Sequence, residues 1–224
     1  MNASSNKFLF HLFVFTSLIY AVHSESKDGS DDQLQAPEFK NMYTKMFLEK
    51  RKAQHEAVKR IADLGNKKKE NEMLKLVLNK LFETLKISLE NLAKKNKDDG
   101  KKLRIDKETI EDVSSVIENT AFASDLALRF PKYFHKAYDK NKSWQFTLET
   151  SISITLQSKL ADETTEKAVY LMSQELNIID KEPNYFNPYS SKKIAEEPLP
   201  TKEILKKKEK KKRGPGLSGG KLDL

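Results

Sequence analysis

Residues 68–95 read KKENEMLKLVLNKLFETLKISLENLAKK, and the leucines of this stretch recur at steps of three or four. That spacing matches the period of an α-helix, so the stretch predicts a helix with an apolar stripe along its length. The stripe consists of Leu74, Leu78, Leu81, Leu85, Leu89 and Leu92. Because Val77, Phe82 and Ile87 widen the stripe, we expect the helix to contact more than one partner helix, as in a bundle.

Helical periodicity continues on both sides of this stretch. Further helices are expected over residues 38–64, 107–130, 133–138, 143–160 and 162–177. Gly65 supplies a left-handed stop after the helix at 38–64, and Pro131 ends the helix at 107–130, because proline lacks an amide hydrogen and clashes with the preceding turn. No run shows the alternation of a strand. We interpret the chain as all-α: a single compact bundle of about five helices at residues 38–190, with a disordered N-terminal leader and a basic C-terminal tail.

The first 24 residues have the three parts of a secretory signal peptide. Lys7 lies in a short polar start, residues 8–20 are apolar, and Ala21 and Ser24 are small. The apolar run is shorter than the roughly 20 residues that a helix needs to cross a membrane. We interpret residues 1–24 as a signal peptide and the polar residues 25–37 as the disordered leader. No later stretch approaches membrane-spanning length, so no transmembrane segment is expected.

Residues 191–224 are interpreted as a disordered, lysine-rich tail. Positions 201 to 224 contain nine basic and three acidic residues, so this part carries +6 of the formal net charge of +8. Its basic cluster consists of Lys206, Lys207, Lys208, Lys210, Lys211, Lys212 and Arg213. Because no aromatic residue interleaves the cluster for base stacking, we expect no nucleic-acid partner. A solubilising spacer and a contact for an acidic partner protein are the two interpretations of the cluster.

The last four residues, Lys221, Leu222, Asp223 and Leu224, resemble the KDEL retrieval signal of the endoplasmic reticulum. Leu222 departs from that signal, which has an acid at this position. With the signal peptide, the tetrapeptide predicts location in the lumen of the endoplasmic reticulum and binding of the C-terminus by a retrieval receptor. Because Leu222 weakens the signal, secretion of part of the protein is left open beside this location. The sequence contains no cysteine, so a lumenal fold is expected to hold by packing alone.

Residues 25–224 offer little catalytic chemistry. They contain two histidines, His55 and His135, and neither lies in an H-x-x-x-H or H-E-x-x-H pattern. There is no glycine-rich phosphate loop, no G-x-S-x-G and no EF-hand spacing. We therefore expect a non-enzymatic protein without a metal or cofactor. His135, which lies among aromatic residues, is interpreted as a packed side chain.

A sequon for N-linked glycosylation is formed by Asn141, Lys142 and Ser143, in a predicted turn. Glycosylation of Asn141 is one expectation for a lumenal chain. The alternative is that Trp144 lies too close to the sequon for a transferase to act.

Four runs stand out: YTKMFLEKRKAQ at residues 43–54, VIENTAFASDLALRFP at 116–131, LMSQELN at 171–177 and NYFNP at 184–188. They resemble the coiled-coil domain-containing protein 134 family, and the similarity extends over the chain from the signal peptide to the basic tail. The resemblance implies a non-enzymatic lumenal or secreted factor that assists endoplasmin, the chaperone of the endoplasmic reticulum, in folding and glycosylation control. It also implies two alternatives, a secreted modulator of MAP-kinase signalling and a nuclear protein associated with a transcriptional adaptor.

Two segments are candidate contact surfaces for a protein partner. One is residues 118–131, for which packing in the core is the alternative. The other is residues 185–189, where three aromatic residues are expected to hold an irregular segment against the helices. The candidate residues are Glu118, Asn119, Phe122, Arg129, Phe130, Pro131, Tyr185, Phe186 and Tyr189.

Overall fold

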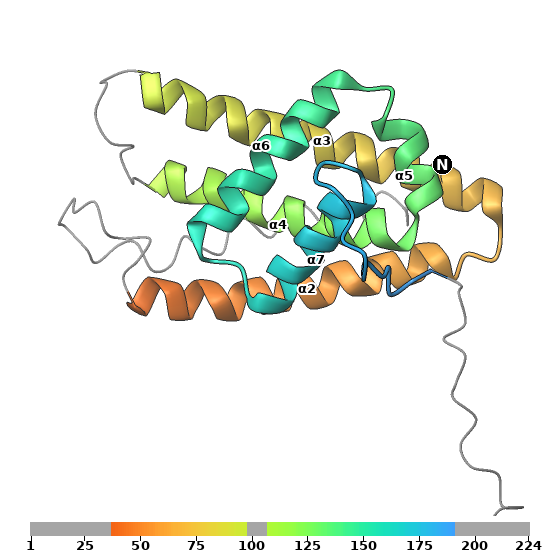
Figure 1. Cartoon of the computed structure of the whole chain (residues 1–224). Coiled ribbons are helices and arrows are strands. Elements are labelled where there is room, and N and C mark those ends of the chain that lie inside the picture. Colours follow the sequence, from red (N-terminus) through yellow and green to blue (C-terminus); the bar gives the residue numbers. More distant parts are fainter. Residues whose placement is uncertain (1–36, 98–106, 191–224) are drawn as a thin grey trace, which may run out of the picture. The chain divides into compact units, whose positions relative to one another are not determined.

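The computed structural model describes residues 37–97 and 107–190, and this part of the chain is built from helices and their connections (Figure 1). The helices are α2 Pro37–Ala62, α3 Lys67–Lys97, α4 Lys107–Arg129, α5 Pro131–Tyr138, α6 Lys142–Ser158 and α7 Glu163–Glu175. The all-α prediction is confirmed. The described residues form six helices, one at each of the six stretches where the sequence predicts a helix, the short aromatic stretch after Pro131 included, in line with a bundle of about five.

The turn between α2 and α3 follows the sequence signals. Gly65 has a φ of +62°, a left-handed conformation that glycine adopts without the steric penalty of a side chain. Asn66 then caps α3, because its Oδ1 accepts hydrogen bonds from the backbone amides of Lys68 and Lys69 at 3.0 and 3.1 Å. The two residues reverse the chain direction and satisfy the first free amides of α3.

The break at Pro131 is also present. Phe130 has φ −125° and ψ 52°, and Pro131 is the first residue of α5. Proline is well tolerated there, since the amide at this position has no partner within the helix. The bend directs α5 away from α4 and brings Phe134 and Tyr138 into the core.

Helix α4 is the centre of the bundle and packs against all five of the other described helices. Almost every side chain over residues 109–128 is buried, including several serines and threonines. Two of these hydroxyls form hydrogen bonds within the helix: Thr120 donates to the Val116 carbonyl at 2.7 Å and Ser124 to the Ala121 carbonyl at 2.7 Å. A helix of small and weakly polar residues can therefore be enclosed on all sides.

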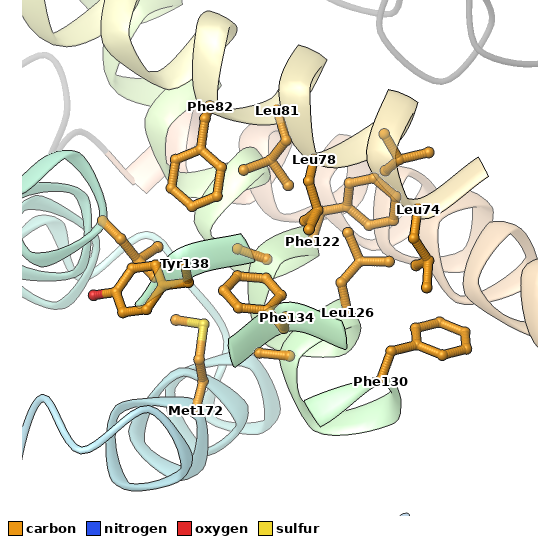
Figure 2. Packing of buried hydrophobic residues seen from close by; sticks show 14 of the residues in the cluster. Leu74, Leu78, Leu81, Phe82, Phe122, Leu126, Phe130, Phe134, Tyr138 and Met172 are labelled. Atoms are coloured by element: carbon orange, nitrogen blue, oxygen red, sulfur yellow. The ribbon is translucent and has the colours of Figure 1, made fainter. Parts of the chain in front are cut away.

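The main core lies where α3, α4 and α5 meet. Figure 2 shows Leu74, Leu78 and Leu81 of α3 pointing toward Phe122 and Leu126 of α4. The aromatic part of the same core joins α3, α5 and α6. Its side chains are Phe82, Phe134, Tyr138 and Trp144, with Phe82 stacked on Trp144 at a centroid distance of 4.2 Å.

A second, smaller core lies between α2 and the first half of α4. Phe39, Tyr43 and Phe47 stack in succession along α2, with centroid distances of 6.1 and 5.7 Å. Val116 and Ile117 of α4 belong to this second core. The two cores together explain why α2 needs apolar residues along most of its length.

Several helix ends differ by one or two residues from the sequence expectation, among them ends of α3 and α6. Helix α3 runs to Lys97, beyond the expected end at Lys95. Helix α6 begins at Lys142 and is capped by Asn141, whose side chain binds the Trp144 amide, whereas Ser143 was expected to open it. It ends at Ser158, followed by Lys159 in a left-handed conformation with φ 56°. A polar cap and a non-glycine left-handed residue leave weaker sequence signals than Gly65 does.

Several predicted features lie outside the described residues. They are the signal peptide at residues 1–24, the leader up to residue 36, and the tail at 191–224 with its basic cluster 206–213 and final residues 221–224. Among the helices that the structure does describe, none combines the length and apolarity needed to cross a membrane.

Candidate protein-interaction surface

After α7 the chain continues as a segment without regular structure, residues 176–189, which we term the strap (blue, following α7, in Figure 1). The turn into the strap is a Schellman motif. Asn177 has a φ of 54°, and the Ile178 amide donates to the Ser173 carbonyl at 2.9 Å. Ile178 packs against the main core, so the strap is anchored at its start.

The Glu175 carboxylate, at the end of α7, holds the middle of the strap. Its Oε2 accepts hydrogen bonds from the Tyr185 hydroxyl and, at 3.0 Å, from Asn187 Nδ2. Lys181 lies 3.9 Å from Oε1 of the same carboxylate and 5.0 Å from the centroid of the Tyr185 ring. Burial, followed by the bond to Glu175, raises the pKa of Tyr185. The phenol therefore remains a donor to this carboxylate over the physiological pH range.

Asn187 ties the strap to α4. It is buried, and its Nδ2 donates to the Leu128 carbonyl at 3.0 Å while its Oδ1 accepts from the Tyr189 amide at 2.9 Å. The Leu128 carbonyl is one of the last in α4, and such groups lack a partner within their helix. One amide side chain thus satisfies a helix end and fixes the backbone of the strap.

Two aromatic side chains of the strap remain exposed on this scaffold. Phe186 is 45% exposed and Tyr189 is 44% exposed. The Arg129 guanidinium, from the last turn of α4, lies 4.9 Å from the centroid of the Tyr189 ring, a cation–π contact. Arginine and aromatic side chains are enriched among the residues that dominate protein-binding energy. We call Arg129, Phe186 and Tyr189 the strap surface.

Replacing Asn187 by alanine is expected to release the strap without unfolding the helices. The variant leaves the Leu128 carbonyl without this donor. A buried polar group that has lost its partner costs about 1–3 kcal/mol of stability. Hydrogen exchange at residues 184–189 should accelerate roughly 10- to 100-fold, while exchange in α3 and α4 stays unchanged. Asn184→Ala is the matched control, because Asn184 is exposed. Equal protection of the strap in both variants would show that Asn187 does not hold it.

The predicted contact segment at 118–131 is divided by the structure between core and surface. Phe122 is 1% exposed, and Asn119 and Phe130 are also buried, because this face of α4 is covered by neighbouring helices. These three side chains are packing residues and cannot reach a partner in the folded protein. Arg129 is exposed and Pro131 half-buried. Only the end of the segment therefore joins the strap in forming a surface.

Glu118 belongs to a row of polar contacts between α2 and α4, which we call the polar seam. Its residues are Lys50, Arg51, Gln54, Glu118 and Asp125. The Glu118 carboxylate lies 3.5 Å from Lys50 Nζ, and both side chains are largely buried. Burial raises the pKa of Glu118, and the nearby Lys50 charge opposes that rise. The pair belongs to the contact between two helices of the bundle.

A buried ion pair lies in the same seam and was not predicted from the sequence. Asp125 accepts two hydrogen bonds from Arg51, at 2.7 and 2.9 Å, and each side chain is 7% exposed. Arg51 also donates to Gln54 Oε1 at 2.7 Å and lies 3.1 Å from His55 Nε2. Gln54 donates in turn to the Glu118 carbonyl at 2.9 Å. The available signal was an acid surrounded by apolar and small residues in a helix, since such an acid needs a buried partner.

His135 is a packed residue, as predicted. Its Nε2 lies 2.9 Å from the Glu175 carbonyl and its Nδ1 lies 3.1 Å from both oxygens of Asp139. It therefore links α5 to the end of α7, close to where the strap begins. Across residues 37–97 and 107–190, no group of three or more His, Cys, Asp or Glu side chains is arranged to hold a metal ion.

The fold and the strap surface define an all-α protein whose exposed aromatic and arginine side chains are suited to binding another protein. Residues 28–218 match the family described as "ERK and JNK pathways, inhibitor", and the chain belongs to this family. It is 32% identical over 151 residues to coiled-coil domain-containing protein 134 of Mus musculus and 31% identical over 149 residues to that of Xenopus tropicalis. The resemblance noted in the sequence is thus confirmed.

These matches cover 67% and 66% of this chain and 66% and 65% of the two relatives, so the matched part spans slightly less than two thirds of each relative. No solved structure matches the chain.

Proposed function

We propose that this protein restrains ERK and JNK signalling by binding a protein partner, without catalysing a reaction, and that the strap surface makes the contact. The observation that carries the proposal is the match of residues 28–218 to a family described as an inhibitor of these pathways. The geometry supports it, because Arg129, Phe186 and Tyr189 are exposed, and the guanidinium of Arg129 contacts the ring of Tyr189.

Preorganisation favours the strap as a binding surface. Tyr189 is positioned by its own backbone bond to Asn187 and by the Arg129 guanidinium. A side chain that is already ordered loses less conformational entropy when a partner binds, which raises affinity. An aromatic residue at the centre of an interface contributes about 2 kcal/mol or more, ~30-fold in affinity.

We place the site of action in the secretory pathway or outside the cell. The support is the signal-peptide pattern of residues 1–24, with its polar start, apolar run and small residues near the end. A factor in the lumen or outside the cell is separated from the cytosol by a membrane, so we propose that it acts on the kinase pathways through a lumenal or extracellular partner.

Phosphorylation of ERK and JNK in stimulated cells tests the proposal. Cells that receive the purified chain produced by a secretory host should show less phosphorylation of both kinases, and the same chain denatured beforehand should have no effect. A chain made without residues 1–24 and kept in the cytosol should leave both kinases unchanged. Unaltered phosphorylation with folded external protein would overturn the proposal. If only the cytosolic chain lowered the phosphorylation of the two kinases, the proposed site of action in the secretory pathway or outside the cell would be overturned.

A second candidate function is favoured by the final residues, Lys221 to Leu224, which resemble a retrieval signal. Under this hypothesis the protein is returned to the endoplasmic reticulum and assists endoplasmin there. Co-precipitation of endoplasmin with the full chain from lumenal extracts would support it. If removal of residues 221–224 leaves kinase restraint intact and no endoplasmin is recovered, the first function stands alone.

A further inference from the structure

The turn between α5 and α6 presents Asn141 in a defined geometry. Asn141 has extended backbone angles, φ −117° and ψ 92°, and is the N-cap of α6. Its Oδ1 accepts a hydrogen bond from the Trp144 amide at 3.1 Å. A backbone amide can only donate, so the oxygen of the side chain faces the helix and Nδ2 is the other end of the amide. Among the described residues, none accepts a hydrogen bond from Nδ2.

The other two residues of the sequon are accessible. Lys142 and Ser143 are exposed at the start of α6. Trp144, whose bulk was the argument against modification, lies with its indole stacked on Phe82 of α3 at 4.2 Å, with an angle of 8° between the planes. The indole is directed into the bundle, so the steric objection from Trp144 does not hold in the folded protein.

Modification of Asn141 is compatible with the cap. Attachment of a sugar to Nδ2 leaves the amide oxygen and its lone pairs in place, so the bond from the Trp144 amide persists. The turn has further support from the Gln145 side chain, which donates to the Asp139 carbonyl at 3.0 Å. Residues 138–145 can therefore keep one conformation with or without a glycan.

We propose that Asn141 carries an N-linked oligosaccharide. Nδ2 attacks the anomeric carbon of an N-acetylglucosamine on an oligosaccharide carried by a lipid diphosphate, which is the co-reactant. A carbon–nitrogen bond forms, the bond from that carbon to the diphosphate oxygen breaks, and Nδ2 loses one proton. The lipid diphosphate leaves, and no oxidation or reduction occurs. This inference rests on the secretory entry that is part of the proposed function, but not on kinase restraint.

The sequence makes the test simple, because Asn141 begins the one N-x-S/T sequon of residues 25–224. The full chain is produced in a eukaryotic secretory host and treated with peptide-N-glycosidase in heavy-oxygen water. Wild type should lose the mass of one glycan and gain a labelled aspartate at position 141. Asn141→Gln and Ser143→Ala should both abolish the shift, and Ser143→Thr should keep it. Ser143→Ala retains the Asn141 cap, so it separates loss of the glycan from loss of the cap.

A matched control uses Asn66, which caps α3 as Asn141 caps α6. Lys68→Thr, placed in the Asn141→Gln background, creates a sequon at Asn66, another asparagine that caps a helix and has exposed neighbours. Wild type without a glycan, beside a glycosylated control, would overturn the proposal while leaving secretory entry intact. Absence of a glycan on both chains would overturn the proposal together with secretory entry.

Discussion

Asp125→Ala is expected to lower the free energy of unfolding by about 3–5 kcal/mol, because it leaves the Arg51 charge buried without its carboxylate. Arg51 is 7% exposed in the seam between α2 and α4, and water cannot replace the lost partner fully. The remaining contacts of Arg51, to Gln54 and His55, include no carboxylate. The expected change corresponds to a fall in Tm of roughly 6–20 °C for a domain of this size, measured by circular dichroism.

Two controls show whether the loss of stability in Asp125→Ala comes from the unpaired buried charge of Arg51 or only from the removal of a side-chain contact. Asp139→Ala removes an acid that is 56% exposed beside His135, and surface pairs contribute only about 0–1 kcal/mol. The double variant Arg51→Met with Asp125→Leu removes both charges and keeps most of the volume, so it should be far more stable than Asp125→Ala. A double variant that unfolds as readily as Asp125→Ala would contradict the explanation.

Phe82→Ala is expected to lower the free energy of unfolding by about 3–5 kcal/mol as well, through the cavity that it leaves. Phe82 is 2% exposed and contacts Trp144 and Phe134, so it joins α3 to both α6 and α5. Trp144 is the one tryptophan of the chain, and its fluorescence reports this contact directly. In the variant, emission should shift to the red and the unfolding midpoint in urea should fall.

Phe146→Ala is the matched control for Phe82→Ala. Phe146 is 72% exposed on α6, so the same truncation should change stability by no more than about 0.5 kcal/mol. Phe82→Leu should lie between the two, because leucine fills part of the space. Equal losses for Phe82→Ala and Phe146→Ala would show that the core has been placed wrongly.

The outline of the fold follows from short-range signals in the sequence. The leucines of α3 have the spacing of a helix with a wide apolar face, and this helix does contact α2, α4 and α6. Gly65 and Pro131 act through backbone chemistry that depends little on surroundings, so both breaks were predictable. Lys159 and Asn177 also adopt left-handed conformations. Lysine carries no signal for this conformation, and asparagine a weaker one than glycine.

The environment of α4 was harder to predict. Its serines, threonines, Asn119 and Asp125 suggest a helix with a solvated side, yet the helix is enclosed by five others. Thr120 and Ser124 form hydrogen bonds within the helix, but Asp125 depends on Arg51, which lies 74 residues away in sequence. Partners at such distances leave no periodic signal, so the sequence left open which residues of 118–131 are core and which, like Arg129, are exposed.

The strap was predictable only in part. Three aromatic residues within five positions indicated a segment held against the helices. Their individual roles depend on contacts with Glu175 and Leu128, which place Tyr185 on the inner side and leave Phe186 and Tyr189 accessible. In a segment without a repeating period, sequence alone does not separate the residues that anchor it from those that face solvent.

The dose dependence of kinase restraint for the double variant Phe186→Ala with Tyr189→Ala tests the central claim most directly. Wild type and Phe146→Ala are measured beside it, with ERK and JNK phosphorylation as the readout and circular dichroism as the check on folding. The double variant should need at least ~30-fold more protein for the same effect, and Phe146→Ala should match wild type. A folded double variant as potent as wild type would contradict the assignment of the strap surface.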